Sequence, residues 1–150
     1  MIIKATLSDA EKLTEIAIKS KAHWGYTNAQ IESWREDLTV TEKLFQQREI
    51  YKYVSENEII GFYILNLEYA KDTSDLQFLF ISPNAIGKGV GARMLNHAFQ
   101  LAIENHKELM NVLSDPNAAT FYAKYGFVEI AREKSSIPGR FLPIMQKELL

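Results

Sequence analysis

One short segment combines the residue types best suited to hold a phosphate. Residues 84–95 read NAIGKGVGARML, with glycines at 87, 89 and 91 followed by the apolar spacing of a helix. Glycine loses more conformational freedom on folding than any other residue, so three glycines in five positions indicate a role for the backbone itself. A helix N-terminus offers unpaired N–H groups and a partial positive charge, and Lys88 adds a cation. The segment predicts a phosphate-binding loop or, alternatively, a tight turn that requires glycine sterically.

Two common nucleotide-binding loops do not match this spacing. A P-loop continues from its Gly-Lys pair into Ser or Thr, whereas Lys88 is followed by Gly89. A dinucleotide-binding loop has the pattern G-x-G-x-x-G after the first strand of its domain, with an acidic residue about 20 positions later. The glycines here are spaced differently and follow the fourth predicted strand. Neither of these two loop types fits, and the tight-turn alternative stays open.

An aromatic bend near the N-terminus forms a second group of candidate residues. The sequence SKAHWGY at 20–26 brings together His23, Trp24 and Tyr26. Aromatic faces accept cations or apolar chains, and histidine titrates near neutral pH, so these three residues are candidates for substrate binding. The alternative is that Trp24 and Tyr26 cap the core while His23 lies on the surface.

The elements that must position these residues alternate between strand-like and helix-like patterns. Two capping patterns, Ser8 with Glu11 and Thr27 with Gln30, predict the starts of the first two helices. Asp115-Pro116 opens the last helix, and Gly126 closes it. Apolar periodicity predicts strands at 2–6, 51–53, 59–64, 76–81, 109–113, 127–132 and 141–147, a short helical turn at 41–47 and a helix at 90–105. The order β-α-α-β-β-β-α-β-α-β-β predicts an α/β (mixed α+β) fold whose sheet contains a parallel crossover from 76 to 113.

Composition sets the broad class. The chain has 150 residues, of which 47% are hydrophobic and 24% charged, as expected of a single globular domain spanning residues 1–150. A net charge of −2 gives no electrostatic support for nucleic-acid binding. Cysteine is absent and the three histidines are scattered, so no metal site is expected. Without a signal-peptide pattern or an apolar run of about 20 residues, no membrane association is expected, and the expected compartment is the cytoplasm.

Two segments together resemble the GCN5-related N-acetyltransferase (GNAT) superfamily. The loop LFISPNAIGKGVG, residues 79–91, is similar to the family's acyl-CoA-binding motif [Q/R]-x-x-G-x-[G/A], with Gly89 and Gly91 at the two small positions. Ile86 stands where the family has Gln or Arg. The segment DPNAATFYAKYGF, residues 115–127, resembles the family's N-x-x-A-x-x-[FLY]-Y-x-x-x-G-F, with Asp115 at the usual Asn position. The resemblance implies a GNAT-like domain with a mostly antiparallel sheet of about seven strands and about four helices.

The resemblance also implies a donor and the residues that hold it. The donor would be acetyl-CoA, and no metal would be needed. Its pyrophosphate would lie on backbone amides of the glycine loop, and its pantetheine arm would pair with the fourth strand and contact Asp115 or Asn117. The implied cofactor-binding residues are Leu79, Phe80, Ile81, Gly87, Lys88, Gly89, Val90, Gly91, Ala92, Asp115, Asn117 and Tyr122. For Asp115 the alternative is a simple N-cap ahead of Pro116.

Acyl transfer from a thioester to an amine sets three chemical demands. The amine must be neutral, although an alkylamine has a pKa of about 10.4. The oxyanion needs a donor, for which a main-chain N–H of the strand containing Leu79, Phe80 and Ile81 is a candidate. The departing thiolate needs a proton, and by family analogy Tyr122 is the catalytic general acid; the alternative is that Tyr122 only packs the helix. The base stays open between Asp75, His23, Glu32, Tyr26 and a water relay, since Gln77 cannot titrate.

The leading hypothesis is therefore an acetyl-CoA-dependent N-acyltransferase that acts by direct attack in a ternary complex. A small-molecule amine is favoured over a protein as acceptor. Arg140 is a candidate partner for an acceptor carboxylate, although the favoured expectation for it is a solvated loop arginine. The alternative hypothesis is a non-catalytic acyl-CoA sensor, suggested by Ile86, Gln77 and the absence of an obvious base. A homodimer is compatible with the sequence, because homodimers are the commonest oligomers.

Overall fold

The computed structural model describes all 150 residues, which form five α-helices and seven strands. By their contacts the residues divide into two compact units. Unit 1 comprises Met1–Leu65 and Phe78–Ala98, and unit 2 comprises Asn66–Gln77 and Phe99–Leu150. Strand β4 (Thr73–Ile81) and helix α4 (Val90–Glu104) each contribute residues to both units.

The strands follow the order β1-β2-β3-β4-β5-β7-β6. The remaining strands are β1 (Ile2–Lys4), β2 (Glu49–Ser55), β3 (Glu58–Asn66), β5 (Leu109–Leu113), β6 (Val128–Lys134) and β7 (Phe141–Glu148). β4 and β5 pair in parallel, Thr73 to Leu76 against Leu109 to Val112, as predicted for the crossover. The pairs β1·β2, β2·β3, β5·β7 and β6·β7 are antiparallel. The predicted fold class is confirmed, with five helices in place of about four.

Three helices of unit 1 follow β1: α1 (Ala10–Ala22), α2 (Asn28–Leu38) and α3 (Glu42–Gln47). The predicted capping box of Thr27 and Gln30 is confirmed, since each residue binds the other's backbone N–H. The predicted pair Ser8 and Glu11 is wrong. Thr6 and Asp9 form the box instead, because a 3₁₀ turn at Leu7–Asp9 precedes α1.

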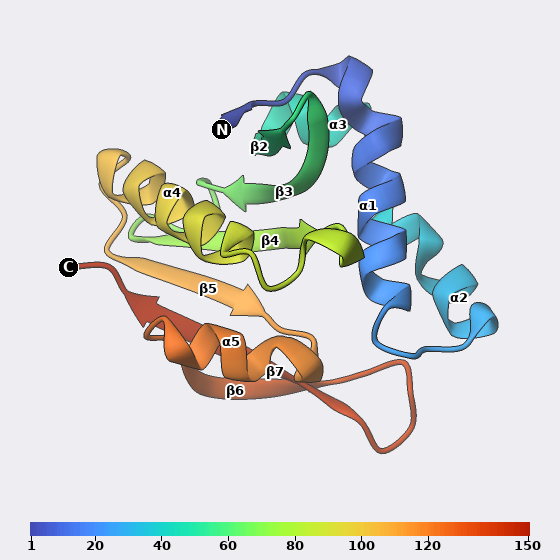
Figure 1. Ribbon diagram of the computed structural model, residues 1–150. Helices are drawn as coiled ribbons and strands as arrows, with labels where there is room; N and C mark the ends of the chain where they lie inside the picture. Colours follow the sequence, from blue (N-terminus) through green and yellow to red (C-terminus); the bar gives the residue numbers. More distant parts are fainter. The chain divides into compact units, whose positions relative to one another are not determined.

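Strand β3 shows how unit 1 builds two faces. Phe62 and Ile64 are fully buried in a core with Leu13, Ile16 and Ala17 of α1, and Trp34 of α2 packs against this core. Gly61 and Tyr63 alternate with them and face α4, where a β-carbon at Gly61 would lie 3.0 Å from Met94. Figure 1 shows α1 along one side of β3 and β4 and the first turns of α4 on the other.

Unit 2 consists of the first half of β4, strands β5, β7 and β6, the end of α4, and helix α5 (Ala119–Lys124). Figure 1 shows α5 lying over β6 and β7. Phe127, fully enclosed, contacts Phe99 of α4 and Tyr122 of α5 through their rings. No helix is long and apolar enough to cross a membrane.

Candidate functional site

The glycine loop lies in unit 1, between β4 and α4. A 3₁₀ turn at Pro83–Ala85 leads into it, and Gly87 and Gly89 have positive φ angles of 86° and 77°. Only glycine adopts such angles without strain, so these two positions require it for the path of the backbone. Gly91 has no positive φ angle, because it belongs to the first turn of α4, where it is buried. The loop therefore combines a real steric need for glycine with an exposed rim.

The first turn of α4 leaves three N–H groups without an acceptor. The first main-chain hydrogen bond of the helix runs from Arg93 to the Gly89 carbonyl (3.2 Å), and the N–H groups of Val90, Gly91 and Ala92 bind no other residue. Unpaired N–H groups and the positive end of the helix dipole favour an anion. The loop has the backbone groups that the phosphate prediction needs.

Two cations accompany these amides. Lys88 is exposed at the rim, as predicted. Arg93, which the sequence reading missed, turns back from the helix: its Nη1 donates to the Lys88 carbonyl (3.1 Å) and to the Tyr53 hydroxyl (3.2 Å). Neither cation forms a salt bridge. Helical side chains lean toward the N-terminus, which is the signal that would have pointed to Arg93.

The predicted strand residues Leu79, Phe80 and Ile81 end β4 within unit 1 and are partly buried. Phe80 packs with Phe62 and Phe78 in an aromatic group (centroids 5.7–6.0 Å apart). Gly61 of β3 lets the backbone of β4 lie close to it, because a β-carbon at Gly61 would lie only 3.1 Å from the Phe80 carbonyl oxygen. The side chains of this strand end thus serve packing.

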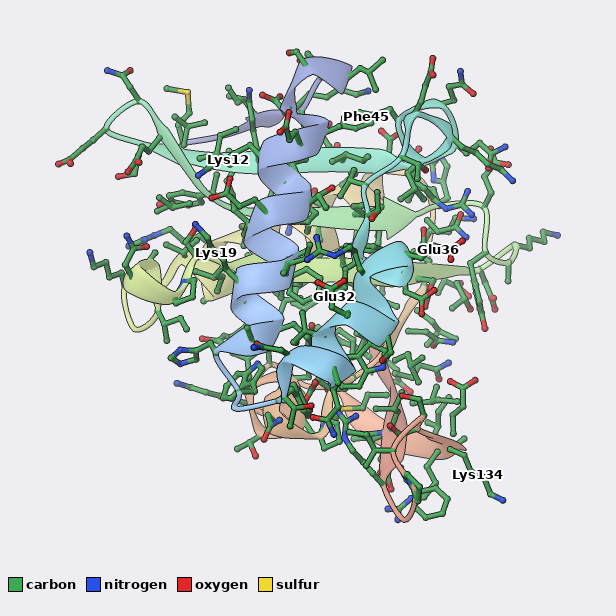
Figure 2. The ribbon with its side chains drawn as sticks, turned by 90° about the vertical axis from the view of Figure 1, so that its right-hand side faces the viewer. Lys12, Lys19, Glu32, Glu36, Phe45 and Lys134 are labelled. Carbon is green, nitrogen blue, oxygen red and sulfur yellow. The ribbon has the colours of Figure 1, made fainter.

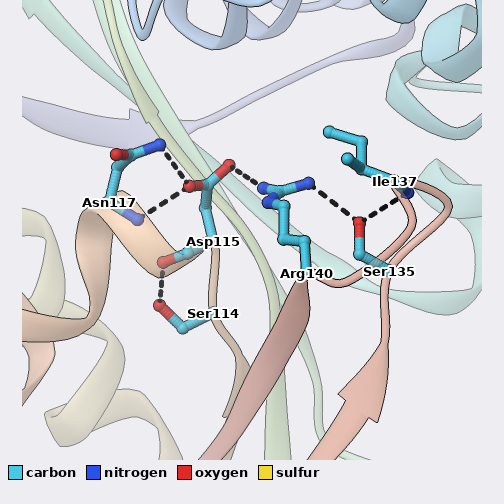
Figure 3. Close-up of polar contacts among 6 residues, drawn as sticks. All are labelled: Ser114, Asp115, Asn117, Ser135, Ile137 and Arg140. Carbon is cyan, nitrogen blue, oxygen red and sulfur yellow. Dashed lines mark hydrogen bonds and ion pairs between the residues drawn. The ribbon is translucent and has the colours of Figure 1, made fainter.

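In unit 2, Asp115 is held by its own neighbours (Figure 3). Its carboxylate accepts hydrogen bonds from the backbone N–H and the side-chain amide of Asn117, both 2.9 Å, and so acts as an N-cap for the 3₁₀ turn Pro116–Ala118. It also pairs with Arg140 at 3.2 Å, while Arg140 donates to Ser135 at 2.9 Å. The Arg140 side chain is 17% exposed, so the expectation of a solvated loop arginine is wrong.

Tyr122 lies on α5 with 5% of its surface exposed. Its ring contacts Phe121 and Phe127 edge-on, at centroid distances of 5.3 and 5.4 Å. Its hydroxyl forms no hydrogen bond to another residue. Burial, and then the negative charge of Asp115, raise the pKa of the Tyr122 phenol above its ordinary value of 10.0. The phenol therefore keeps its proton throughout the neutral range.

The aromatic bend of unit 1 divides into an exposed and a packed part. Trp24 is 45% exposed and contacts the His23 ring at 5.6 Å, so it does not cap the core. Tyr26 packs edge-on against Trp34 at 4.9 Å, and the Lys21 ammonium lies 5.6 Å and 5.2 Å from these two ring centroids. The structure thus shows a cation held by this aromatic pair, and the cation belongs to the chain itself.

A groove of about 520 Å³ lies elsewhere in unit 1, between α1 and α2. Among its charged residues, Glu15 pairs with Lys12 and Lys19, and Arg35 pairs with Glu32. Figure 2 shows Lys12 and Lys19 on α1 and Glu32 on α2. The hydrogen bonds from Arg35 lower the pKa of Glu32, which makes Glu32 a weaker base. None of the predicted site residues lines this groove. No cluster of three or more metal-ligating side chains exists in the 150 residues.

The acetyltransferase (GNAT) domain model matches residues 6–149, nearly the whole chain and both units. The chain belongs to the GNAT family. The predicted family is thereby confirmed. No curated protein matches the sequence.

Solved structures with the same fold include other GNAT proteins. A GCN5-related N-acetyltransferase from Rhodopseudomonas palustris has a TM-score of 0.82 at 21% identity, covering 99% of this chain and 94% of that one. The PaiA N-acetyltransferase from Thermoplasma acidophilum, in complex with coenzyme A, has a TM-score of 0.80 at 22% identity and coverages of 99% and 98%. An aminoglycoside 6′-N-acetyltransferase complexed with coenzyme A has a TM-score of 0.77 at 14% identity, covering 100% of this chain and 97% of that one. Family and fold together support an acyl-CoA-dependent N-acetyltransferase.

Proposed function

We propose that this GNAT protein transfers an acetyl group from acetyl-CoA to a primary amine of a small molecule, by direct attack in a ternary complex. The observation that carries the proposal is the glycine loop: three unpaired N–H groups at the start of α4, on a backbone that only Gly87 and Gly89 allow, beside cations without carboxylate partners. Such a loop suits the diphosphate of a CoA thioester.

The end of β4 would supply main-chain groups to the donor. Leu79, Phe80 and Ile81 use their side chains for packing, which leaves the backbone for pairing with the pantetheine arm and for donating to the oxyanion. Because the backbone would contact the donor, strand geometry would matter more for donor binding here than the identity of the side chains. The side chains of both pantetheine candidates already have partners within the chain: the Asn117 amide binds Asp115, whose other carboxylate oxygen pairs with Arg140.

Tyr122 would act as general acid toward the CoA thiolate. Burial of its ring raises the pKa of the phenol and keeps it neutral, and its hydroxyl donates a hydrogen bond to no other residue. A positioned acid of this kind contributes about 10²- to 10⁴-fold to a rate. The amine nitrogen bonds to the thioester carbonyl carbon and loses a proton to solvent. The C–S bond then breaks, the thiolate takes the proton of the phenol, and solvent returns a proton to the phenolate.

The acceptor class rests on the exposed aromatic bend. His23, Trp24 and Tyr26 lie at the end of α1, where the Tyr26–Trp34 pair already holds the ammonium of Lys21. A surface that holds one alkylammonium group suits an alkylamine acceptor. The aminoglycoside 6′-N-acetyltransferase of the same fold acts, as its name states, on an aminoglycoside.

The test is an acetyl-transfer assay with acetyl-CoA and a panel of polyamines, amino acids, aminoglycosides and lysine peptides. The expected result is thiol release coupled to an acetylated small amine, identified by mass spectrometry. Acetylation of peptides alone would overturn the acceptor class. Tight CoA binding with no product from any amine would replace the enzyme by a non-catalytic sensor. No CoA binding at all would refute the proposal.

A further inference from the structure

The glycine loop lacks the polar side chain that its family motif provides. Ile86 occupies that position and is 45% exposed, with nothing on its side chain to bind a phosphate. A loop that binds a highly charged donor would then rely on backbone amides and on Lys88, a flexible and strongly hydrated cation at the rim. The structure shows a second cation at the loop, the guanidinium of Arg93.

Arg93 places a guanidinium beside the loop. A β-carbon at Gly89 would lie 3.7 Å from the guanidinium carbon and from both Nη atoms, so any side chain there would contact the group. Nη1 is fixed by the Lys88 carbonyl and the Tyr53 hydroxyl. Nε and Nη2 have no acceptor in the protein, and no carboxylate neutralises the charge. Arg93 is therefore anchored on one nitrogen and open on the others.

We propose that Arg93 is a donor-binding residue that contacts a phosphate of CoA in place of the missing side chain at position 86. The inference rests on the proposed function. The cation of the motif has moved from the first position of the loop to the first turn of α4, where the backward lean of helical side chains returns it to the loop. A planar guanidinium can bind a phosphate through two N–H groups, and Tyr53 fixes its orientation beforehand.

The experiment measures CoA affinity by calorimetry for the wild type, Arg93→Gln, Ile86→Arg and the double variant. We expect Arg93→Gln to weaken binding about 10-fold, the usual size of one charge-assisted contact at a partly exposed site. Ile86→Arg in the Arg93→Gln background should recover most of that loss. A merely structural role would not give this recovery, because a new arginine at 86 does not restore the contacts to Tyr53 and Lys88.

Two control variants separate the charge from its supports. Tyr53→Phe removes an anchor and keeps the cation, so it should change affinity less than about 3-fold. Lys43→Gln removes an exposed positive charge on α3 and should have no effect. An unchanged affinity in Arg93→Gln, or an equal loss in either control, would overturn the inference.

The donor analogue 3′-dephospho-CoA identifies the phosphate. An equal loss for CoA and 3′-dephospho-CoA assigns Arg93 to the diphosphate, and a loss confined to CoA assigns it to the 3′-phosphate; both support the proposal. A wild type that fails to bind CoA would refute the proposed function itself. Wild-type binding with an indifferent Arg93 would refute only the role of this residue. Circular dichroism confirms that each variant is folded.

Discussion

The glycine loop and the Asp115 segment carry the two motifs of the family, and they treat their polar groups in opposite ways. At the loop, three amides have no acceptor within the chain, and neither Lys88 nor Arg93 has a carboxylate partner. At Asp115, both carboxylate oxygens are bound, one by Asn117 and the other by Arg140 (Figure 3). Unpaired groups on an exposed loop are free to bind a ligand, whereas paired and largely buried groups stabilise the fold. The first motif is suited to binding and the second to holding α5 in place.

Tyr122 is the exception within the second segment. It is buried like its neighbours, yet its hydroxyl has no hydrogen-bond partner. No enclosed side-chain oxygen or nitrogen in the structure lacks a hydrogen-bond partner, so the Tyr122 hydroxyl is accessible although its ring is buried. Within one short stretch of chain, both carboxylate oxygens of Asp115 are paired, whereas the Tyr122 hydroxyl binds no other residue.

The largest expected effect comes from Tyr122→Phe. Loss of the general acid should lower kcat about 100-fold or more and leave the CoA dissociation constant unchanged, because the ring still packs against Phe127. Steady-state kinetics and calorimetry measure the two quantities. Tyr125→Phe on the same helix end is the matched control and should keep full kcat. Equal activity in Tyr122→Phe and wild type would make Tyr122 a packing residue.

Gly89→Glu should have the next largest effect. Bulk and negative charge at a positive φ beside Arg93 should weaken CoA binding about 50-fold, the combined size of strain and repulsion at an anion site. Gly25→Glu introduces the same side chain at a φ of 88° in open space, and should bind CoA normally. If both variants lose affinity alike, general strain rather than the loop would be responsible.

Asp115→Ala should act on stability rather than on the donor. Removing the N-cap and leaving Arg140 without its carboxylate should lower the free energy of unfolding by about 2 kcal/mol, measured by urea denaturation. Lys88→Gln, in the other region, should change it by less than about 0.5 kcal/mol. A comparable loss in Lys88→Gln would break the distinction between the two segments.

The pH dependence of kcat should show the smallest effect. Since burial raises the pKa of Tyr122 above 10.0, the acid stays protonated in the folded enzyme as the pH rises through 9 and 10. The pH profile at saturating acetyl-CoA should therefore show no alkaline fall due to this group. A descending limb near pH 8 or 9 that disappears in Tyr122→Phe would mean that the phenol is not perturbed as its surroundings require.

Much of the fold follows from local sequence signals. Local patterns predict three of the elements: the pair Thr27 and Gln30 predicts α2, apolar spacing predicts α4, and an apolar run predicts β5. These determinants lie within a few residues of one another. The first residues of β4 do not. Thr73, Ser74 and Asp75 are polar, yet Thr73 and Ser74 are buried, since pairing with β5 satisfies their backbone groups and Ser74 donates to the Leu109 carbonyl.

The candidate site was predictable where backbone conformation decides it. The spacing of the glycines is enough to predict the loop. The contact of Arg93 with Tyr53 joins residues 40 positions apart, and that of Arg140 with Asp115 joins residues 25 apart. Such pairs depend on how strands and helices pack, and no local pattern encodes them. The sequence therefore located the glycine loop and missed Arg93 beside it and the partner of Asp115.

The central claim is that CoA binds on the unpaired amides of the glycine loop. The most direct measurement is a titration of the ¹⁵N-labelled protein with CoA, following each backbone amide by NMR. The account predicts that the largest shifts fall on Gly87 to Ala92, with the N–H signals of Val90, Gly91 and Ala92 moving as they acquire an acceptor. Saturable binding that leaves these amides unmoved would contradict it.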